Sequence, residues 1–133
     1  MKRHPLLWLL LVSAALVGCG GGDSDDGPAQ TVRDFVTATR EHDADTFCGR
    51  LVTQEFLEQT TGATGDGAEE ACRRELKAVR GLEVKLVKIE QTTVDGDEAT
   101  VRAVLTTEGR RDPRTFALKR EDGDWKLAGG SGR

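Results

Sequence analysis

The stretch EVKLVKIEQTTVDGDEATVRAVLTTEGRRDPRTFALKREDGDWKLAG (Glu83–Gly129) decides the fold, because its apolar residues follow the period of β-strands. Asp95-Gly96 and Asp122-Gly123 provide tight turns between strands. A phase slip after Leu86 indicates a β-bulge in the first strand. The stretch therefore predicts a four-stranded antiparallel meander, whose apolar strand residues are Val84, Leu86, Val87, Ile89, Ala99, Val101, Ala103, Leu105, Phe116, Leu118, Trp125 and Leu127.

The residues before this stretch have helical periodicity instead. Pro28 suits the first turn of a helix that runs to about Glu41, and Asp43 can cap a second helix. A third helix is predicted from about Ala68 to Gly81, a plausible stop signal. The expected fold is therefore α+β, with three N-terminal helices packed on one face of a curved four-stranded antiparallel sheet, a conical roll.

The N-terminus has the features of an export signal. Lys2 and Arg3 precede Leu6–Val17, twelve residues that are apolar except for Ser13. A membrane-spanning helix needs about 20 apolar residues, so this segment has the length of a signal-peptide core. Leu16-Val17-Gly18-Cys19 resembles a bacterial lipobox. The alternatives are an ordinary secretory signal with a chance cysteine and a short uncleaved anchor.

The lipobox resemblance implies removal of residues 1–18 and acylation of Cys19, with the protein extracytoplasmic and lipid-anchored to the bacterial cell membrane. Two or more acyl chains would give stable anchoring, since each buried methylene contributes roughly 0.8 kcal/mol. Residues 19–27 then form a lipidated cysteine and an acidic, glycine-rich tether, residues 28–129 form one domain, and residues 130–133 form a flexible tail.

Charge and cysteine content agree with an exported domain. From Cys19 onward the chain carries 17 basic and 23 acidic side chains, a net charge of −6, which argues against nucleic acid as a partner. Cys48 and Cys72 fall on apolar faces of the second and third helices. A disulfide between them is predicted, worth about 3.5 kcal/mol by the chain-entropy relation. The alternative is two buried free thiols.

The order of elements carries a second resemblance. The segments AQTVRDFVTATREHDADTFCGRLV (Ala29–Val52) and FALKREDGDWKLAG (Phe116–Gly129) resemble the nuclear transport factor 2-like (cystatin-like) superfamily, especially its small exported bacterial lipoproteins. The resemblance spans about Pro28 to Gly129. It implies a conical shell in which helices and a bent sheet enclose a pocket. Candidate pocket residues are Phe35, Val101, Phe116 and Trp125, and the alternative is a filled core.

No catalytic or metal-binding constellation is evident in the sequence. His42 beside Asp43 and Asp45 suits either a general base or a solvent-facing turn, and the spacing favours the turn. Enzymes of the resembled superfamily often use a tyrosine as oxyanion donor, whereas this sequence has no tyrosine. The one histidine after residue 19 and two cysteines committed to a disulfide do not provide the clustered ligands that zinc requires. We therefore assign no catalytic residue, no metal and no cofactor.

These observations favour a membrane-anchored domain that binds a small apolar ligand or an envelope protein without catalysis. An isomerase or hydrolase of the same fold is the first alternative. The second is a structural or homodimerising module that uses the outer sheet face, with Thr100, Arg102, Val104 and Thr106. An enclosed apolar cavity would favour ligand binding, and a filled cone would favour the structural module.

Overall fold

The computed structural model describes residues 26–79 and 81–132 of the chain. The predictions for the signal peptide and for Cys19 lie outside these residues. The described residues form four α-helices, one π-helical turn and four strands, in the order α1 (Asp26–Glu41), α2 (Ala44–Thr46), η1 (Phe47–Leu51), α3 (Gln54–Thr61), α4 (Asp66–Ala78), β1 (Val84–Asp95), β2 (Glu98–Thr107), β3 (Arg110–Glu121) and β4 (Asp124–Gly132). No helix within residues 26–79 and 81–132 is long and apolar enough to cross a membrane.

The sheet is the antiparallel meander that the sequence predicts, with strand order β1-β2-β3-β4. Its register shifts between Leu86 and Lys88, where the phase slip indicated a bulge, and Val87 is left 53% exposed. Gly96 (φ 60°) and Gly123 (φ 84°) occupy the left-handed conformation that the two tight turns require. The α+β fold class is confirmed.

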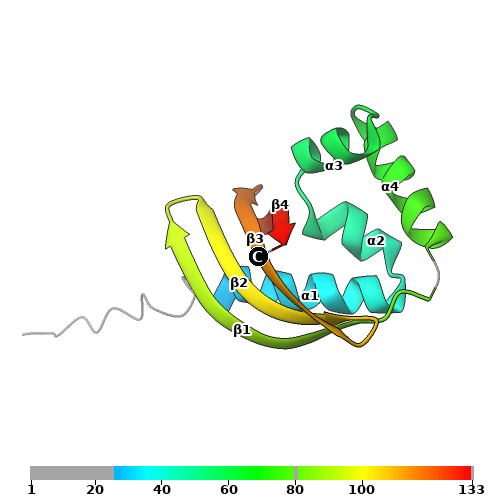
Figure 1. The fold of residues 1–133 in the computed structure, drawn as a ribbon. Helices are drawn as coiled ribbons and strands as arrows, with labels where there is room; N and C mark the ends of the chain where they lie inside the picture. Colours follow the sequence, from blue (N-terminus) through cyan, green and yellow to red (C-terminus); the bar gives the residue numbers. More distant parts are fainter. Residues whose placement is uncertain (1–25, 80, 133) are drawn as a thin grey trace, which may run out of the picture.

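Helix α1 lies along the inside of the curved sheet and contacts β1, β2 and β4 (Figure 1). Its buried face carries Val32 and Val36, whereas Arg33 and Asp34 are exposed. This is the amphipathic pattern of a helix with one face in the core. The core between α1 and the sheet includes Val101, Leu118 and Leu127, all no more than 2% exposed.

The second predicted helix is divided into α2, η1 and α3, so the expected number of three helices is approximate. The division lies at Val52, whose backbone is extended (φ −121°, ψ 148°). There the chain pairs with β4, since Thr53 N donates to Leu127 O at 2.9 Å. The Thr53 side chain then caps α3 by accepting from Phe56 N at 3.2 Å. Pairing with a distant strand thus interrupts a locally helical sequence.

Two predicted boundaries also differ from the structure. Strand β4 continues through Gly132, with Gly130 opposite Phe116 and Gly132 opposite Arg114, where a flexible tail was expected. Strand pairing uses backbone groups, so a glycine-rich end can still pair. Helix α1 begins at Asp26, which places Gly27 in the helix and not in the tether.

Candidate functional site

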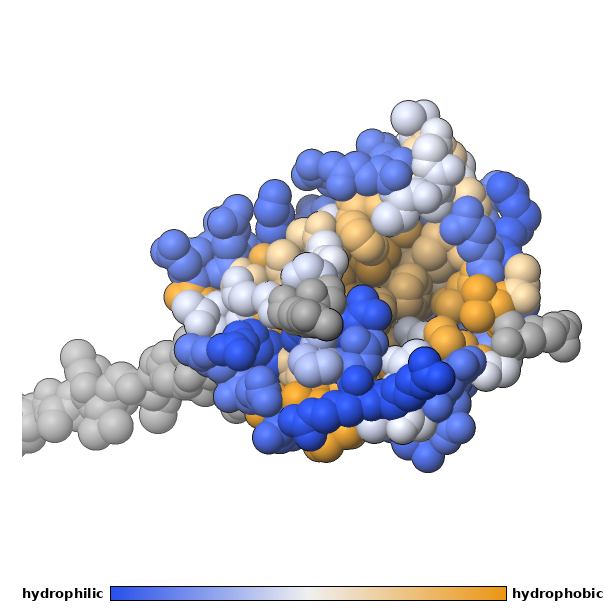
Figure 2. Space-filling view, in the orientation of Figure 1, coloured by the Kyte–Doolittle hydropathy of each residue, from blue (hydrophilic) through white to orange (hydrophobic). Residues whose placement is uncertain are grey.

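An apolar cavity of about 470 Å³ opens between the helices and the concave face of the sheet. All four phenylalanines of the sequence line it: Phe35 on α1, Phe47 on η1, Phe56 on α3 and Phe116 on β3. Aliphatic side chains complete the wall, from Leu82, Val84, Leu105 and Leu127. Figure 2 shows a hollow with a mostly hydrophobic interior on this face of the molecule.

Three of the phenylalanine rings are held by contact with each other or with the core. The ring centroids of Phe35 and Phe47 lie 5.0 Å apart, and those of Phe35 and Phe116 lie 5.8 Å apart in an edge-on arrangement. Such tilted and edge-on pairs are favourable geometries for aromatic rings. Phe116 is only 7% exposed, so it forms the inner wall.

The four predicted pocket residues do not all meet in this cavity. Phe35 and Phe116 line it. Val101 is the cross-strand partner of Phe116 and is fully buried in the core, without lining the cavity. Trp125 packs on the N-terminal half of α1, where its carbonyl accepts from Thr31 Oγ1 at 3.1 Å. Its ring centroid lies 4.7 Å from the guanidinium carbon of Arg120 on β3.

Sequence reasoning missed Phe47 and Phe56 as cavity residues. The signal that was available is compositional, because the whole sequence has four phenylalanines and all of them converge here.

Glycines at the end of β4 leave space in the cavity. Gly129 and Gly130 both contribute to its wall. A Cβ atom on Gly130 would lie 3.6 Å from Phe116 Cδ1, an ordinary van der Waals distance, so a side chain would fit at this position and occupy cavity volume. Gly129 is paired with Ala117, which is exposed. The absence of a side chain at Gly130 therefore helps to keep the cavity open.

One edge of the cavity is polar. Asp112 Oδ2 accepts from Arg114 Nε at 2.9 Å and from Thr107 Oγ1 at 3.2 Å. Asp112 and Arg114 alternate along β3 with the same parity as Phe116, which places all three on the cavity face. The Asp112 side chain is 24% exposed and the Arg114 side chain 45% exposed, as suits groups at the rim.

His42 and its neighbouring aspartates form a turn. His42 is exposed, has φ 57° and does not line the apolar cavity. Asp43 accepts from Thr46 N at 3.1 Å, and its hydrogen bonds with Thr46 lower the pKa of its carboxyl. This is helix capping, as the sequence predicts for Asp43. Within the described part of the chain, no group of three or more His, Cys, Asp or Glu side chains is placed to hold a metal ion.

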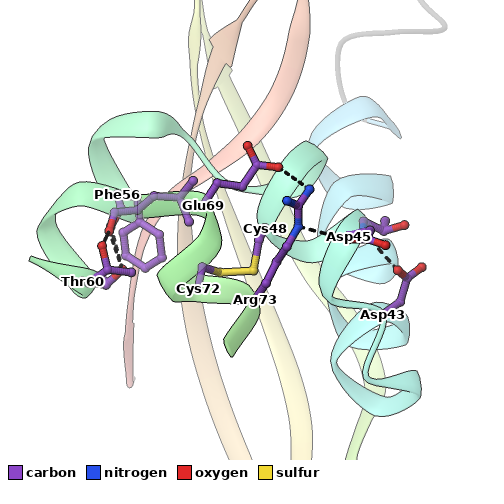
Figure 3. Close-up of a disulfide and its surroundings, with 11 residues drawn as sticks. Asp43, Asp45, Cys48, Phe56, Thr60, Glu69, Cys72 and Arg73 are labelled. Carbon is purple, nitrogen blue, oxygen red and sulfur yellow. Dashed lines mark hydrogen bonds and ion pairs between the residues drawn. A yellow bond between two sulfur atoms is a disulfide. The ribbon is translucent and has the colours of Figure 1, made fainter. Parts of the chain in front are cut away.

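The structure joins the two predicted cysteines in a disulfide, with their Cα atoms 5.9 Å apart. The bond ties η1 to α4 beside a second link, in which Arg73 contacts Asp45 at 3.0 Å and Glu69 at 2.6 Å (Figure 3). Both cysteines are buried. Because Cys48 follows Phe47 directly, this cross-link anchors one wall of the cavity.

The fold, a curved antiparallel sheet around a helix, is that of the NTF2-like (cystatin-like) class. Similar solved structures include an NTF2-like protein from Cytophaga hutchinsonii (16% identity, TM-score 0.60, 80% of this chain and 94% of that chain). An uncharacterised protein with a cystatin-like fold from Caulobacter vibrioides is also similar (17% identity, TM-score 0.61, 84% of this chain and 89% of that chain). A third is a candidate scytalone dehydratase from Novosphingobium aromaticivorans (18% identity, TM-score 0.56, 81% of this chain and 81% of that chain).

The chain belongs to the family described as "Domain of unknown function (DUF4878)", whose family model matches residues 17–128. The comparison with curated proteins found no match. At identities below 20% the solved structures establish the fold, and the function has to be argued from the site itself.

Proposed function

We propose that this protein is an extracytoplasmic lipoprotein, anchored to the bacterial cell membrane through acylated Cys19, whose domain binds a small apolar ligand without changing it chemically. The observation that carries the proposal is the open cavity of about 470 Å³ lined by all four phenylalanines. Ligand sites are typically about 300–1,000 Å³, mostly apolar, with a small number of polar groups. A structural module would instead be expected to fill this space with side chains.

The anchoring part of the proposal rests on the Leu16–Cys19 motif and the basic, apolar segment before it. The disulfide between Cys48 and Cys72 supports it, because such bonds persist mainly in oxidising compartments. The acidic chain has little electrostatic attraction for an anionic bilayer, so the acyl chains would provide the attachment.

The site favours binding over catalysis. A general acid or base must be free to exchange a proton with the substrate. Among the described residues that line the cavity, Asp112 is the single carboxylate, and it is hydrogen-bonded to both Arg114 and Thr107. The likeness to a candidate scytalone dehydratase, at 18% identity, supports the fold and does not assign a reaction to this chain.

Native mass spectrometry of the lipidated chain, recovered from its own envelope, tests ligand binding. We expect an adduct of small-molecule mass on the wild-type protein and its loss in Gly130→Leu, where the new side chain enters the cavity. Ala117→Leu adds the same side chain at an exposed position on β3 and should keep the adduct. A folded wild-type protein with no adduct, or an adduct that Gly130→Leu does not reduce, would contradict the proposal.

A separate experiment tests the anchor. The wild-type chain should partition with membranes and carry acyl mass at its N-terminal cysteine, whereas Cys19→Ala should lose both properties. Recovery of the wild-type chain from the cytosol with residues 1–18 still attached would refute the membrane assignment and leave the cavity proposal to be judged on the adduct.

A further inference from the structure

We infer that the ligand is an amphiphile, with an apolar body in the phenylalanine-lined cavity and an anionic end that binds Arg114 at the rim. This inference rests on the proposed function and specifies the chemical class of its ligand. It is carried by the position of Arg114 and by a second, polar hollow that adjoins the apolar one.

Arg114 is a charged residue on the cavity face of β3, the same face that carries Phe116. Its register partners are Ala103 on β2 and Gly132 on β4, neither of which has a large side chain. The guanidinium therefore stands at the cavity edge without bulky cross-strand neighbours, and its side chain remains 45% exposed.

The guanidinium has unused donors. Its Nε donates to Asp112 Oδ2 at 2.9 Å, and within residues 26–79 and 81–132 its two terminal nitrogens donate to no other group. A guanidinium offers five N–H donors in a planar fork that matches a carboxylate, sulfonate or phosphate group. Asp112 thus holds Arg114 in place and leaves its terminal nitrogens free for an anion.

A second hollow of about 520 Å³ lies beside the cavity and is lined by Thr107, Glu108, Arg110, Arg111 and Asp112. It shares Thr107 and Asp112 with the phenylalanine-lined cavity, so the two spaces are contiguous at this edge. The rim residues between Thr107 and Arg114 include three arginines against Glu108 and Asp112, a local net charge of +1 on a chain of net charge −4. An apolar body in one space would place an anionic end in the other.

The size of the apolar cavity and the sign of the rim charge select the class of molecule. A neutral apolar compound would use the phenylalanines and leave the arginines without a role. A small inorganic anion would gain nothing from the apolar wall. A molecule with both parts satisfies both surfaces, whether it is a fatty acid, a lysophospholipid or an aromatic acid.

Two fluorescent probes that share an apolar body separate these possibilities. 1-Anilinonaphthalene-8-sulfonate carries an anionic group, and N-phenyl-1-naphthylamine lacks it. Binding is measured on the full chain carrying Cys19→Ser, which prevents acylation, and the signal of the same chain with Gly130→Leu is subtracted as binding outside the cavity. Decanoate and decanol then serve as competitors that differ in the same way.

We expect the anionic probe to bind more tightly than the neutral one, and Arg114→Gln to weaken the anionic probe about tenfold with little change for the neutral probe. Arg102→Gln is the matched control, since it removes the same charge from an exposed position of β2 outside the apolar cavity.

Each other outcome has a distinct meaning. Cavity binding of both probes that Arg114→Gln leaves unchanged would refute the anionic end and keep the apolar site. An equal loss in Arg114→Gln and Arg102→Gln would refute the assignment to Arg114. If neither probe bound above the Gly130→Leu background while the chain was folded, the proposed function itself would fail.

Discussion

Phe35 of α1 and Phe116 of β3 lie edge to face, with ring centroids 5.8 Å apart, and both rings line the cavity. The two residues come from opposite halves of the domain. Their contact therefore depends on the curved sheet wrapping around α1. The same contact contributes to the stability of the fold and to the shape of the site.

Replacing Phe116 with alanine should destabilise the protein far more than replacing Phe56. Phe116 is 7% exposed and belongs to the core, so its loss should cost about 3 kcal/mol or more. Phe56 is half-buried on α3, so Phe56→Ala should cost about 1–2 kcal/mol. Urea denaturation followed by circular dichroism measures both values. Equal costs would show that the inner wall is not part of the core.

Removal of the disulfide should lower stability without changing the fold. The double variant Cys48→Ala/Cys72→Ala is expected to lose about 3.5 kcal/mol, with a melting temperature lower by ten degrees or more, at about 4–8 °C per kcal/mol. Hydrogen exchange should accelerate first in α4, which the bond ties to η1. Cys19→Ala, which leaves the bond intact, is the control. Two titratable thiols in the exported wild-type protein would show that the bond does not form.

Substitution of Gly27 by alanine should destabilise the protein, against the usual trend for a helix. Alanine is favoured over glycine in helices by about 1 kcal/mol. Here, however, a Cβ atom would lie 2.8 Å from Trp125 Cδ1, and the rigid indole would have to move, at a cost of about 1–3 kcal/mol.

The partner of this clash can be tested directly. In a Trp125→Leu background the same Gly27→Ala change should become neutral or stabilising, since the ring is gone, and a double-mutant cycle measures the coupling. A stabilising effect of Gly27→Ala in the wild-type protein would contradict the packing of Trp125 on α1.

The α3–α4 loop should depend on the ionisation of Glu58. Two hydrogen bonds of 3.0 Å lower the pKa of this carboxyl from its usual 4.5. The one from the Gln54 side chain has the larger effect, and the one from Gly65 N has the smaller. The ionised form is thus favoured in the folded protein. Its contribution to stability is complete above about pH 4.5 and is lost as the pH falls through the lower folded-state pKa.

NMR titration of the Glu58 carboxyl should therefore give a pKa below that of a glutamate in an unfolded peptide. The difference in melting temperature between wild type and Glu58→Gln should be larger at pH 7 than at pH 3. Glu70→Gln removes the same charge from an exposed position on α4 and is the control. A pH-independent difference would mean that the loop does not rely on this carboxylate.

Several features were predictable from sequence because they depend on local patterns. The alternation from Ala99 to Leu105 and the Asp-Gly turns fixed the meander, and the slip after Leu86 located a bulge. The cysteine pair was predictable because both residues lie on apolar helix faces. The local pattern wrongly predicted a continuous helix through Val52, because the backbone there is extended and pairs with Leu127 of β4.

The site was only partly predictable for a similar reason. Phe35 and Phe116, which the sequence predicts as pocket residues, line the cavity, whereas Trp125, predicted for the same pocket, does not. The register places it at the opposite end of α1, beside Gly27. Phe47 and Phe56 reach the cavity because the helix is broken between them.

The sequence by itself determined the helical first half, the four-stranded meander after it and the apolar faces of both, since these follow from periodicity. From residue chemistry it also predicted the pairing of Cys48 with Cys72. Only the tertiary structure decided that space remains between those faces, which phenylalanines border it and that Arg114 stands at its rim. A cavity is the volume that packed elements fail to fill. Its existence depends on the summed positions of side chains from α1, η1, α3 and the sheet, and on glycines such as Gly130 that contribute none.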